Sequence, residues 1–197
     1  MKETITLREA TADDAPFLAM VVSEAIDSDV MERYEAAGGT IPADRRRLMD
    51  VLESIVRNPD TLYTWRHATI AQNANGEAIG ALVAYPGDDY PARREVTFST
   101  FLEALPLSFD PADMDAETVA GEYYLDSLAV LPSYRGRGVA RRLLQSGIAT
   151  ARELHRPAIL ACSPENLNAK RLYESLGFRA ANLYSLFGHP YWRMICK

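Results

Sequence analysis

The stretch from Leu128 to Leu144, LAVLPSYRGRGVARRLL, constrains the fold more than any other part of the chain. An apolar run ends at Pro132, whose missing N–H cannot continue a central β-ladder, and a helical apolar pattern begins at Val139. Two glycines lie between them. Backbone N–H groups at a helix start lack intrahelical partners, and glycines let an anion approach them closely. The stretch therefore predicts a pyrophosphate cradle; the alternative is an ordinary tight turn that carries arginines.

The cradle is expected to use side-chain charge as well as main-chain amides. Its residues are Arg135, Gly136, Arg137, Gly138, Val139 and Ala140. Two better-known phosphate motifs do not fit the same stretch. A P-loop requires a following Gly-Lys-Ser/Thr, and the third glycine of a dinucleotide fingerprint is replaced by Arg141. The glycine pair alone is thus a weak signal.

Hydrophobic periodicity over the rest of the chain predicts an α/β domain. The expected elements are a strand at 5–8, helices at 17–26 and 45–56, strands at 62–70, 78–85 and 122–130, a helix at 139–154, a strand at 158–162, a helix at 166–176 and two final strands. The order β-α-α-β-β-β-α-β-α-β-β gives a mixed sheet of about seven strands flanked by about four helices. A length of 197 residues fits one domain, 1–197.

Residues 86–121 are expected to form an insertion between the third and fourth strands. The segment is rich in proline and acid, is longer than usual connections, and contains one short helical pattern at 94–104. Such a segment is commonly a lid or a binding loop. Its acids are Asp88, Asp89, Asp110, Asp113, Asp115 and Glu117. They would attract a cationic substrate, or else form a solvated acidic loop.

Composition excludes several classes of function. A net charge of −6 and a pI near 5.1 argue against a nucleic-acid partner and leave room for a cationic small molecule. No window is apolar enough for a membrane span, and the start MKETITLREA has no signal-like apolar core, so we expect a cytoplasmic protein without a membrane partner. Cys162 and Cys196 have no metal-ligand spacing, so we expect them to be buried and expect no metal.

Two segments together resemble the GNAT superfamily of N-acetyltransferases. Leu128-Ala129-Val130-x-Pro132 followed by RGRGVA is similar to its motif A, with the Arg/Gln-x-x-Gly-x-Gly/Ala loop. Asn166-x-x-Ala169-x-x-Leu172-Tyr173-x-x-x-Gly177-Phe178 is similar to its motif B. One helix and one strand separate the motifs, and the predicted element order agrees on both sides, so the resemblance covers nearly the whole chain apart from 86–121.

The resemblance implies a splayed sheet and transfer of an acetyl group from acetyl-CoA to an amine by direct attack. The acceptor would be a small molecule or a protein amine. Pantetheine would run along Leu128, Ala129 and Val130, with main-chain hydrogen bonds from Leu128 and Val130, while the cradle holds the pyrophosphate. Two alternatives stay open: a non-catalytic acyl-CoA-binding or sensing module, and an acyltransferase that uses a longer acyl-CoA. Oligomeric state also stays open, a homodimer included.

By resemblance, Tyr173 would donate a proton to the departing thiolate, since a tyrosine with a pKa near 10 is protonated at neutral pH. Its alternative role is packing. Asn166 would hydrogen-bond the pantetheine arm, or would simply cap a helix.

The proton acceptor requires separate reasoning, because the strand position where several relatives carry a glutamate or histidine is Tyr124. Alternation along a strand places Glu122, Tyr124 and Asp126 on one face up to any bulge near Leu128. Tyr124 and Asp126 are therefore expected to contact the substrate. Asp126 is the first choice as base, with Glu122 acting through a water as the alternative; Asp126 could instead order a turn or pair with an arginine.

Overall fold

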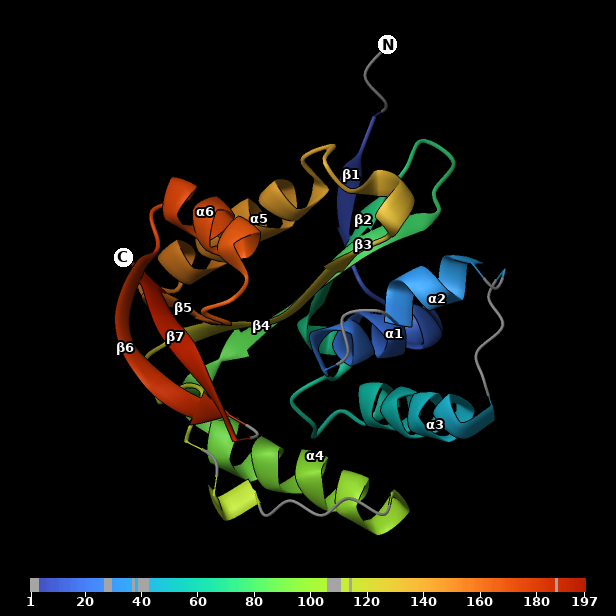
Figure 1. Ribbon diagram of the computed structural model, residues 1–197, viewed down its shortest axis with the longest axis horizontal. Coiled ribbons are helices and arrows are strands. Elements are labelled where there is room, and N and C mark those ends of the chain that lie inside the picture. Colours follow the sequence, from blue (N-terminus) through green and yellow to red (C-terminus); the bar gives the residue numbers. More distant parts are fainter. Residues whose placement is uncertain are drawn as a thin grey trace.

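A seven-stranded sheet in the order β1-β2-β3-β4-β5-β7-β6 forms the centre of the computed structural model (Figure 1). The structure describes residues 4–26, 30–36, 38, 43–105, 111–113, 115–186 and 188–197. The strands are β1 (Thr6–Glu9), β2 (Ala68–Gln72), β3 (Ala78–Pro86), β4 (Tyr123–Val130), β5 (Ala158–Cys162), β6 (Arg179–Leu186) and β7 (His189–Cys196). The helices are α1 (Ala15–Ile26), α2 (Val30–Ala36), α3 (Ala43–Arg57), α4 (Tyr90–Ala104), α5 (Val139–Glu153) and α6 (Leu167–Ser175).

The parallel contact between β4 and β5 is short. Only Tyr123 with Ala158 and Tyr124 with Ile159 are paired, whereas every other neighbouring pair of strands in the sheet is antiparallel and pairs over four or more residues. The two strands part beyond Tyr124, and in Figure 1 β4 crosses the molecule between two groups of helices, paired there only with β3. The prediction of a mixed, splayed sheet is confirmed.

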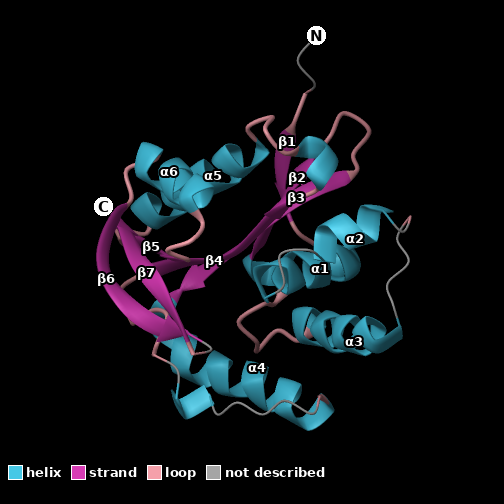
Figure 2. Cartoon of the chain, viewed as in Figure 1, coloured by secondary structure: helices cyan, strands magenta, loops and turns pink. Residues whose placement is uncertain are grey.

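Helices cover both faces of the sheet and bury two separate apolar clusters. Residues of α1, α3 and α4 pack with Val83 and Tyr124 in one cluster, whereas residues of α5 pack with Ala84 and Leu125 in the other. Adjacent strand residues thus enter opposite clusters, as alternation along a strand requires. Figure 2 shows α5 and α6 together on one side of β4 and α1, α2 and α3 on the other.

The structure departs from the predicted elements at three places. Helix α2 was not predicted, and α4 begins at Tyr90, which gives six α-helices among the described residues instead of about four. The strand predicted at 62–70 was wrong over 62–67, since β2 begins at Ala68 after a 3-10 turn at Trp65–His67. The N–H of Leu62 bonds instead to the Thr97 hydroxyl of α4 at 2.9 Å, a tertiary contact without a local signal.

The segment predicted as an insertion is tied down at both ends. The N–H of Gly87 donates to the carbonyl of Glu122 at 3.0 Å. A β-carbon on Gly87 would lie 2.2 Å from the carbonyl oxygen of Val119, so only glycine permits this approach. The approach holds the chain just after Glu117 against the start of α4. Asp110 lies outside the described residues.

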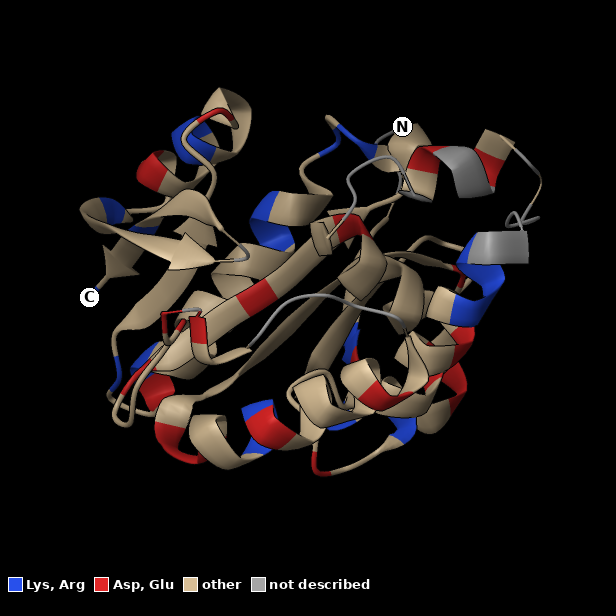
Figure 3. Ribbon diagram, turned by 60° about the horizontal axis from the view of Figure 1, so that its bottom comes forward, with Lys and Arg blue, Asp and Glu red and all other residues tan. Residues whose placement is uncertain are grey.

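Charged residues of both signs are interspersed over the helices (Figure 3). Within the described part of the chain, no helix is long and apolar enough to cross a membrane.

Candidate active site

The gap between β4 and β5 exposes main-chain groups of β4. The N–H of Leu131 donates to Ile79 at 2.9 Å, and Gly80 faces Val130 in the β3–β4 register. Hydrogen-bonded and non-bonded pairs alternate in an antiparallel ladder, so Val130 and Leu128 turn their N–H and C=O groups away from β3. The N–H groups of both residues and the C=O of Leu128 therefore face the gap, as expected for a strand edge that receives pantetheine, whereas the C=O of Val130 accepts from Arg135 Nε. The main chain of Ala129, by the same alternation, turns toward β3.

The Gly-rich loop ends in the start of α5 as the sequence predicts. Gly136 and Gly138 have φ of 74° and 83°, conformations that favour glycine. The first helical hydrogen bond of α5 joins Arg142 N–H to the carbonyl of Gly138 at 3.1 Å, so the N–H groups of residues 139–141 have no intrahelical partner.

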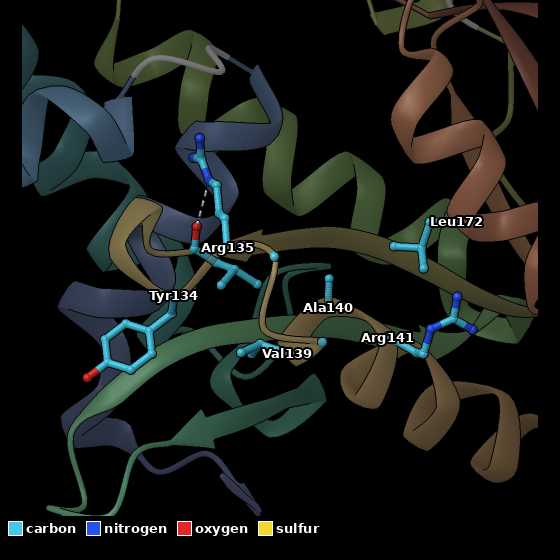
Figure 4. A pocket seen from close by; sticks show the side chains of 9 residues that line it. Tyr134, Arg135, Val139, Ala140, Arg141 and Leu172 are labelled. Carbon is cyan, nitrogen blue, oxygen red and sulfur yellow. Dashed lines mark hydrogen bonds between the residues drawn. The ribbon is translucent and has the colours of Figure 1, made fainter. Parts of the chain in front are cut away.

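A cavity of about 260 Å³ lies over this helix start (Figure 4). Its lining residues are Val130, Tyr134, Arg135, Gly136, Gly138, Val139, Ala140, Arg141 and Leu172. A bare loop, unpaired amides and an adjacent hollow fit a bound phosphate group.

The arginines of the cradle do not all point into this cavity. Arg135 pairs with Glu24 at 3.0 Å and with Glu32 at 2.8 Å, and its Nε donates to Val130 O at 3.1 Å. Figure 4 shows its side chain directed away from Arg141 and Leu172. The guanidinium therefore ties the cradle loop to α1 and α2. That Arg135 supplies charge to a phosphate stays a prediction.

The second arginine of the cradle, Arg137, lies over the ring of Tyr134, 5.0 Å from its centroid, and is not among the residues that line the cavity. Arg141, which sequence reasoning did not single out for the site, donates to the Ser175 hydroxyl at 2.8 Å and so links α5 to α6 across the cavity. The sequence signal that could have pointed to Arg141 is its position in the first turn of the predicted helix.

Helix α6 presents Asn166 and Tyr173. The Oδ1 atom of Asn166 accepts from the N–H of Ala169 at 3.0 Å, so the side chain caps the helix; that Asn166 also bonds the pantetheine arm stays a prediction. The Tyr173 ring packs edge-on against Phe178, with centroids 6.1 Å apart. Burial, together with the nearby Cys162 thiol, raises the pKa of Tyr173 to about 12, so its hydroxyl keeps its proton at neutral pH. Cys162 and Cys196 are buried, as expected.

Asp126 lies at an irregularity of β4. The register with β3 shifts between Val83 and Ala84, which leaves Asp126 without a direct partner. Its carboxylate accepts hydrogen bonds from the hydroxyls of Tyr85 and, at 2.8 Å, Ser127. The side chain is half-buried, and burial raises the pKa of Asp126 to about 6. Its hydrogen-bond partners within the described part of the chain are hydroxyls, not an arginine.

Glu122 and Tyr124 have different surroundings. Glu122 pairs with Arg193 and accepts from Thr118 Oγ1 at 3.0 Å and Val119 N–H at 3.1 Å, so its carboxylate is held in a structural network. Tyr124 is 1% exposed, and its hydroxyl donates to Glu117 Oε2 at 2.7 Å.

Glu117 belongs to this site although the sequence marked it only as one acid of the loop. It is 7% exposed, and its N–H donates to the hydroxyl oxygen of Tyr90 at 3.2 Å. Burial and then the charge of Asp126 raise the pKa of Glu117 to about 7. By contrast, Asp88 pairs with Arg156, and Asp115 accepts from Ser185 N–H at 2.7 Å. No sequence pattern distinguishes the acid that turns inward from those that do not.

Comparison with known proteins now identifies the chain. The model of the Acetyltransferase (GNAT) family matches residues 31–178. The chain belongs to the GNAT family of acetyltransferases. The chain superimposes on solved structures over nearly its full length. One of them, a crystal structure of an acetyltransferase, is 25% identical, with a TM-score of 0.72 over 98% of both chains. An N-acetyltransferase from Staphylococcus aureus Mu50 shares 23% identity and a TM-score of 0.74 over 96% of this chain and 99% of that one.

A third GNAT-like structure is the NatC complex bound to Gag peptide and CoA, with 19% identity and a TM-score of 0.55 over 98% of this chain and 97% of that one. None of the curated protein sequences matches the chain. Among the described residues of this GNAT protein, no three His, Cys, Asp or Glu side chains gather as a metal site would require.

The raised pKa of Glu117 predicts how stability depends on pH. A carboxyl whose pKa is about 7 in the folded state and 4.5 in model compounds stabilises the fold fully below pH 4.5, and this contribution is lost as pH rises through 7. Glu117→Gln, which cannot ionise, should therefore gain stability relative to wild type between pH 5 and 8, on the order of 2 kcal/mol. Urea unfolding at several pH values measures this. Glu95→Gln, an exposed change on α4, should show the same pH dependence of the unfolding free energy as wild type. If Glu117→Gln also showed the wild-type pH dependence, the raised pKa would not belong to Glu117.

Proposed function

We propose that this GNAT acetyltransferase is an N-acetyltransferase that moves an acetyl group from acetyl-CoA to a primary amine by direct attack. One observation carries the proposal: the free edge of β4 runs without a break from the carboxylate of Asp126, past the inward-facing main chain of Leu128 and Val130, into the phosphate cradle. A candidate proton acceptor, an open strand edge for an extended arm and a candidate anion site thus follow one another along residues 126–141.

The chain's own groups fit acetyl-CoA, which supplies the activated acetyl thioester. The amides at the start of α5 would hold the pyrophosphate, with Gly136 and Gly138 permitting close approach. Leu128 and Val130 would bond the pantetheine arm, and the Asn166 amide would add a donor. The NatC complex, which binds CoA, contains this fold, and that supports the assignment.

The transfer needs two proton steps that different residues would perform. The acceptor ammonium gives one proton to Asp126, which passes it to solvent, and the amine nitrogen then forms the N–C bond. The C–S bond breaks with its electron pair on sulfur, and Tyr173 protonates the thiolate. After the N–C bond forms, the nitrogen loses its second proton to solvent, and solvent returns one proton to the Tyr173 phenolate. Asp126 is preferred to Glu122 because Glu122 is committed to Arg193.

Cofactor binding is tested with Gly138→Glu. Acetyl-CoA should raise the melting temperature of the wild type, since a ligand that binds the folded state stabilises it by about 2.7 kcal/mol at one hundred times its Kd. The variant should lose this rise, because glutamate is strained at a φ of 83° and its charge repels phosphate. Gly76→Glu, at the same φ in the β2–β3 turn, is the matched control and should keep the rise. An equal rise of the melting temperature with acetyl-CoA in all three proteins would exclude pyrophosphate binding by the cradle.

Proton donation by Tyr173 is tested with Tyr173→Phe and a thiol-release assay over a panel of amines. The variant keeps the ring that packs on Phe178, so it should bind CoA normally but turn over about 10²- to 10⁴-fold more slowly. Tyr123→Phe removes a hydroxyl that bonds Ala84 O and should leave turnover unchanged. Unchanged turnover in Tyr173→Phe would show that the tyrosine only packs. If the wild type binds CoA but releases no thiol from acetyl-CoA with any amine of the panel, the protein is an acyl-CoA-binding module and not an acetyltransferase.

A further inference from the structure

Three side-chain contacts tie the start of the Gly-rich loop to α1 and α2. The Nη2 atom of Arg135 lies 3.0 Å from Oε1 of Glu24, in the last turn of α1, and its Nη1 atom lies 2.8 Å from Oε1 of Glu32, in the first turn of α2. The Ser133 hydroxyl donates to Oε1 of Glu35 on α2 at 3.1 Å. The turn that leads from β4 into the loop is therefore held by side chains from the first two helices.

Glu24 is the more buried partner of Arg135. Its side chain is 11% exposed, whereas that of Glu32 is 60% exposed. Burial raises the pKa of Glu24, and the Met31 N–H and the charge of Arg135 oppose this rise. The second oxygen, Oε2, accepts from the Met31 N–H at 2.9 Å, at the start of α2. Because removal of the cation would leave a mostly buried carboxylate uncompensated, the pair with Glu24 should contribute more than the exposed pair with Glu32.

The Gly-rich loop depends on such ties because it restrains itself poorly. Gly136 and Gly138 lie at positive φ, and glycine loses more conformational freedom than any other residue when it is fixed. The loop must nevertheless hold the N–H groups of residues 139–141, which lack intrahelical partners, at the cavity. Since Figure 4 shows the Arg135 side chain directed away from Leu172, its ion pairs fix the start of the loop from outside.

We infer that Glu24 is a positioning residue for the cofactor: it holds Arg135 so that the loop keeps its amides directed at the pyrophosphate, and Arg135 acts through this ion pair and not as a phosphate ligand. The inference rests on the proposed function and deepens it. It also couples the cofactor to α1 and α2, because a coupling free energy between two sites acts in both directions. In the opposite arrangement the guanidinium would leave Glu24 and contact phosphate directly.

The two arrangements predict opposite effects of Glu24→Gln on the Kd for CoA, measured by calorimetry. The substitution keeps the size of the side chain and an acceptor for the Met31 N–H but removes the charge. Glu24→Gln and Arg135→Gln should each raise Kd about tenfold, and the double variant should bind like either single variant, because the two residues contribute one shared interaction. If Arg135 were a phosphate ligand, Glu24→Gln would free it and lower Kd. A lowered or unchanged Kd in Glu24→Gln, or losses that multiply in the double variant, would overturn the inference.

Further variants separate positioning from a general loss of stability. Arg135→Lys keeps the charge and should recover part of the affinity for CoA that Arg135→Gln loses. Glu32→Gln removes the exposed pair and should change Kd less than Glu24→Gln. Glu53→Gln breaks a matched pair with Arg57 on α3, at 2.8 Å, and should bind CoA as wild type does. An equal change of Kd in Glu53→Gln and Glu24→Gln would contradict the inference.

Amide exchange at Met31 supplies a readout that a merely structural role would not move. In wild type, saturating CoA should slow exchange of this N–H about threefold or more, because the bound cofactor fixes the loop and with it Arg135 and Glu24. In Arg135→Gln, CoA should leave the exchange rate unchanged. The absence of thiol release with every amine would defeat the proposed function, while CoA binding and exchange would still decide the inference. Exchange at Met31 that does not respond to bound CoA in wild type would defeat the inference alone.

Discussion

The parting of β4 from β5 after two residue pairs is the constraint on which the site depends. A parallel strand that loses its partner leaves main-chain donors and acceptors unpaired, and such groups require another partner when they are buried. The gap begins next to Asp126 and ends at the Gly-rich loop, so the same loss of pairing leaves a strand edge along which the proposed pantetheine arm would lie. The irregularity opposite Val83 and Ala84 adds to this by leaving Asp126 outside the ladder.

Burial of negative charge is the second feature of the site. Glu117 and Asp126 accept hydrogen bonds from tyrosine hydroxyls, and burial raises the pKa of both, while the charge of Arg94 opposes this rise at Glu117. Two other acids of the same loop have structural partners instead: Asp88 pairs with Arg156, and Asp115 accepts from Ser185 N–H. Glu117 is the acid of this loop that turns toward Tyr124. The close approach at Gly87 holds that acid in place.

The sequence predicted most of the fold because its strands and helices carry strong local patterns. Glycine and proline determine the strand–loop–helix unit from Leu128 to Leu144 and the turn before β3. Both motifs that resemble GNAT proteins lie on the elements that the sequence predicts for them. The strand assignment of residues 62–67 was wrong, because the N–H of Leu62 bonds to the Thr97 hydroxyl of α4 and Trp65–His67 form a 3-10 turn. Helix α2 was missed.

The site was only partly predictable for a related reason. Main-chain functions follow from local sequence, so the cradle and the inward-facing edge of β4 were foreseeable. The partners of charged side chains are set by tertiary packing. Hence nothing local indicated that Arg135 would pair with Glu24, that Glu122 would pair with Arg193, or that Glu117 would be buried against Tyr124.

Amide hydrogen exchange with residue resolution tests the central claim most directly, because the account places the cofactor on main-chain groups. Saturating CoA should slow exchange at the N–H groups of Leu128 and Val130 and at residues 139–141, about tenfold or more beyond the change at Ala129, whose N–H already faces β3. Unchanged exchange at Leu128 and Val130 while CoA is bound would contradict the claim that the open edge of β4 receives the pantetheine arm.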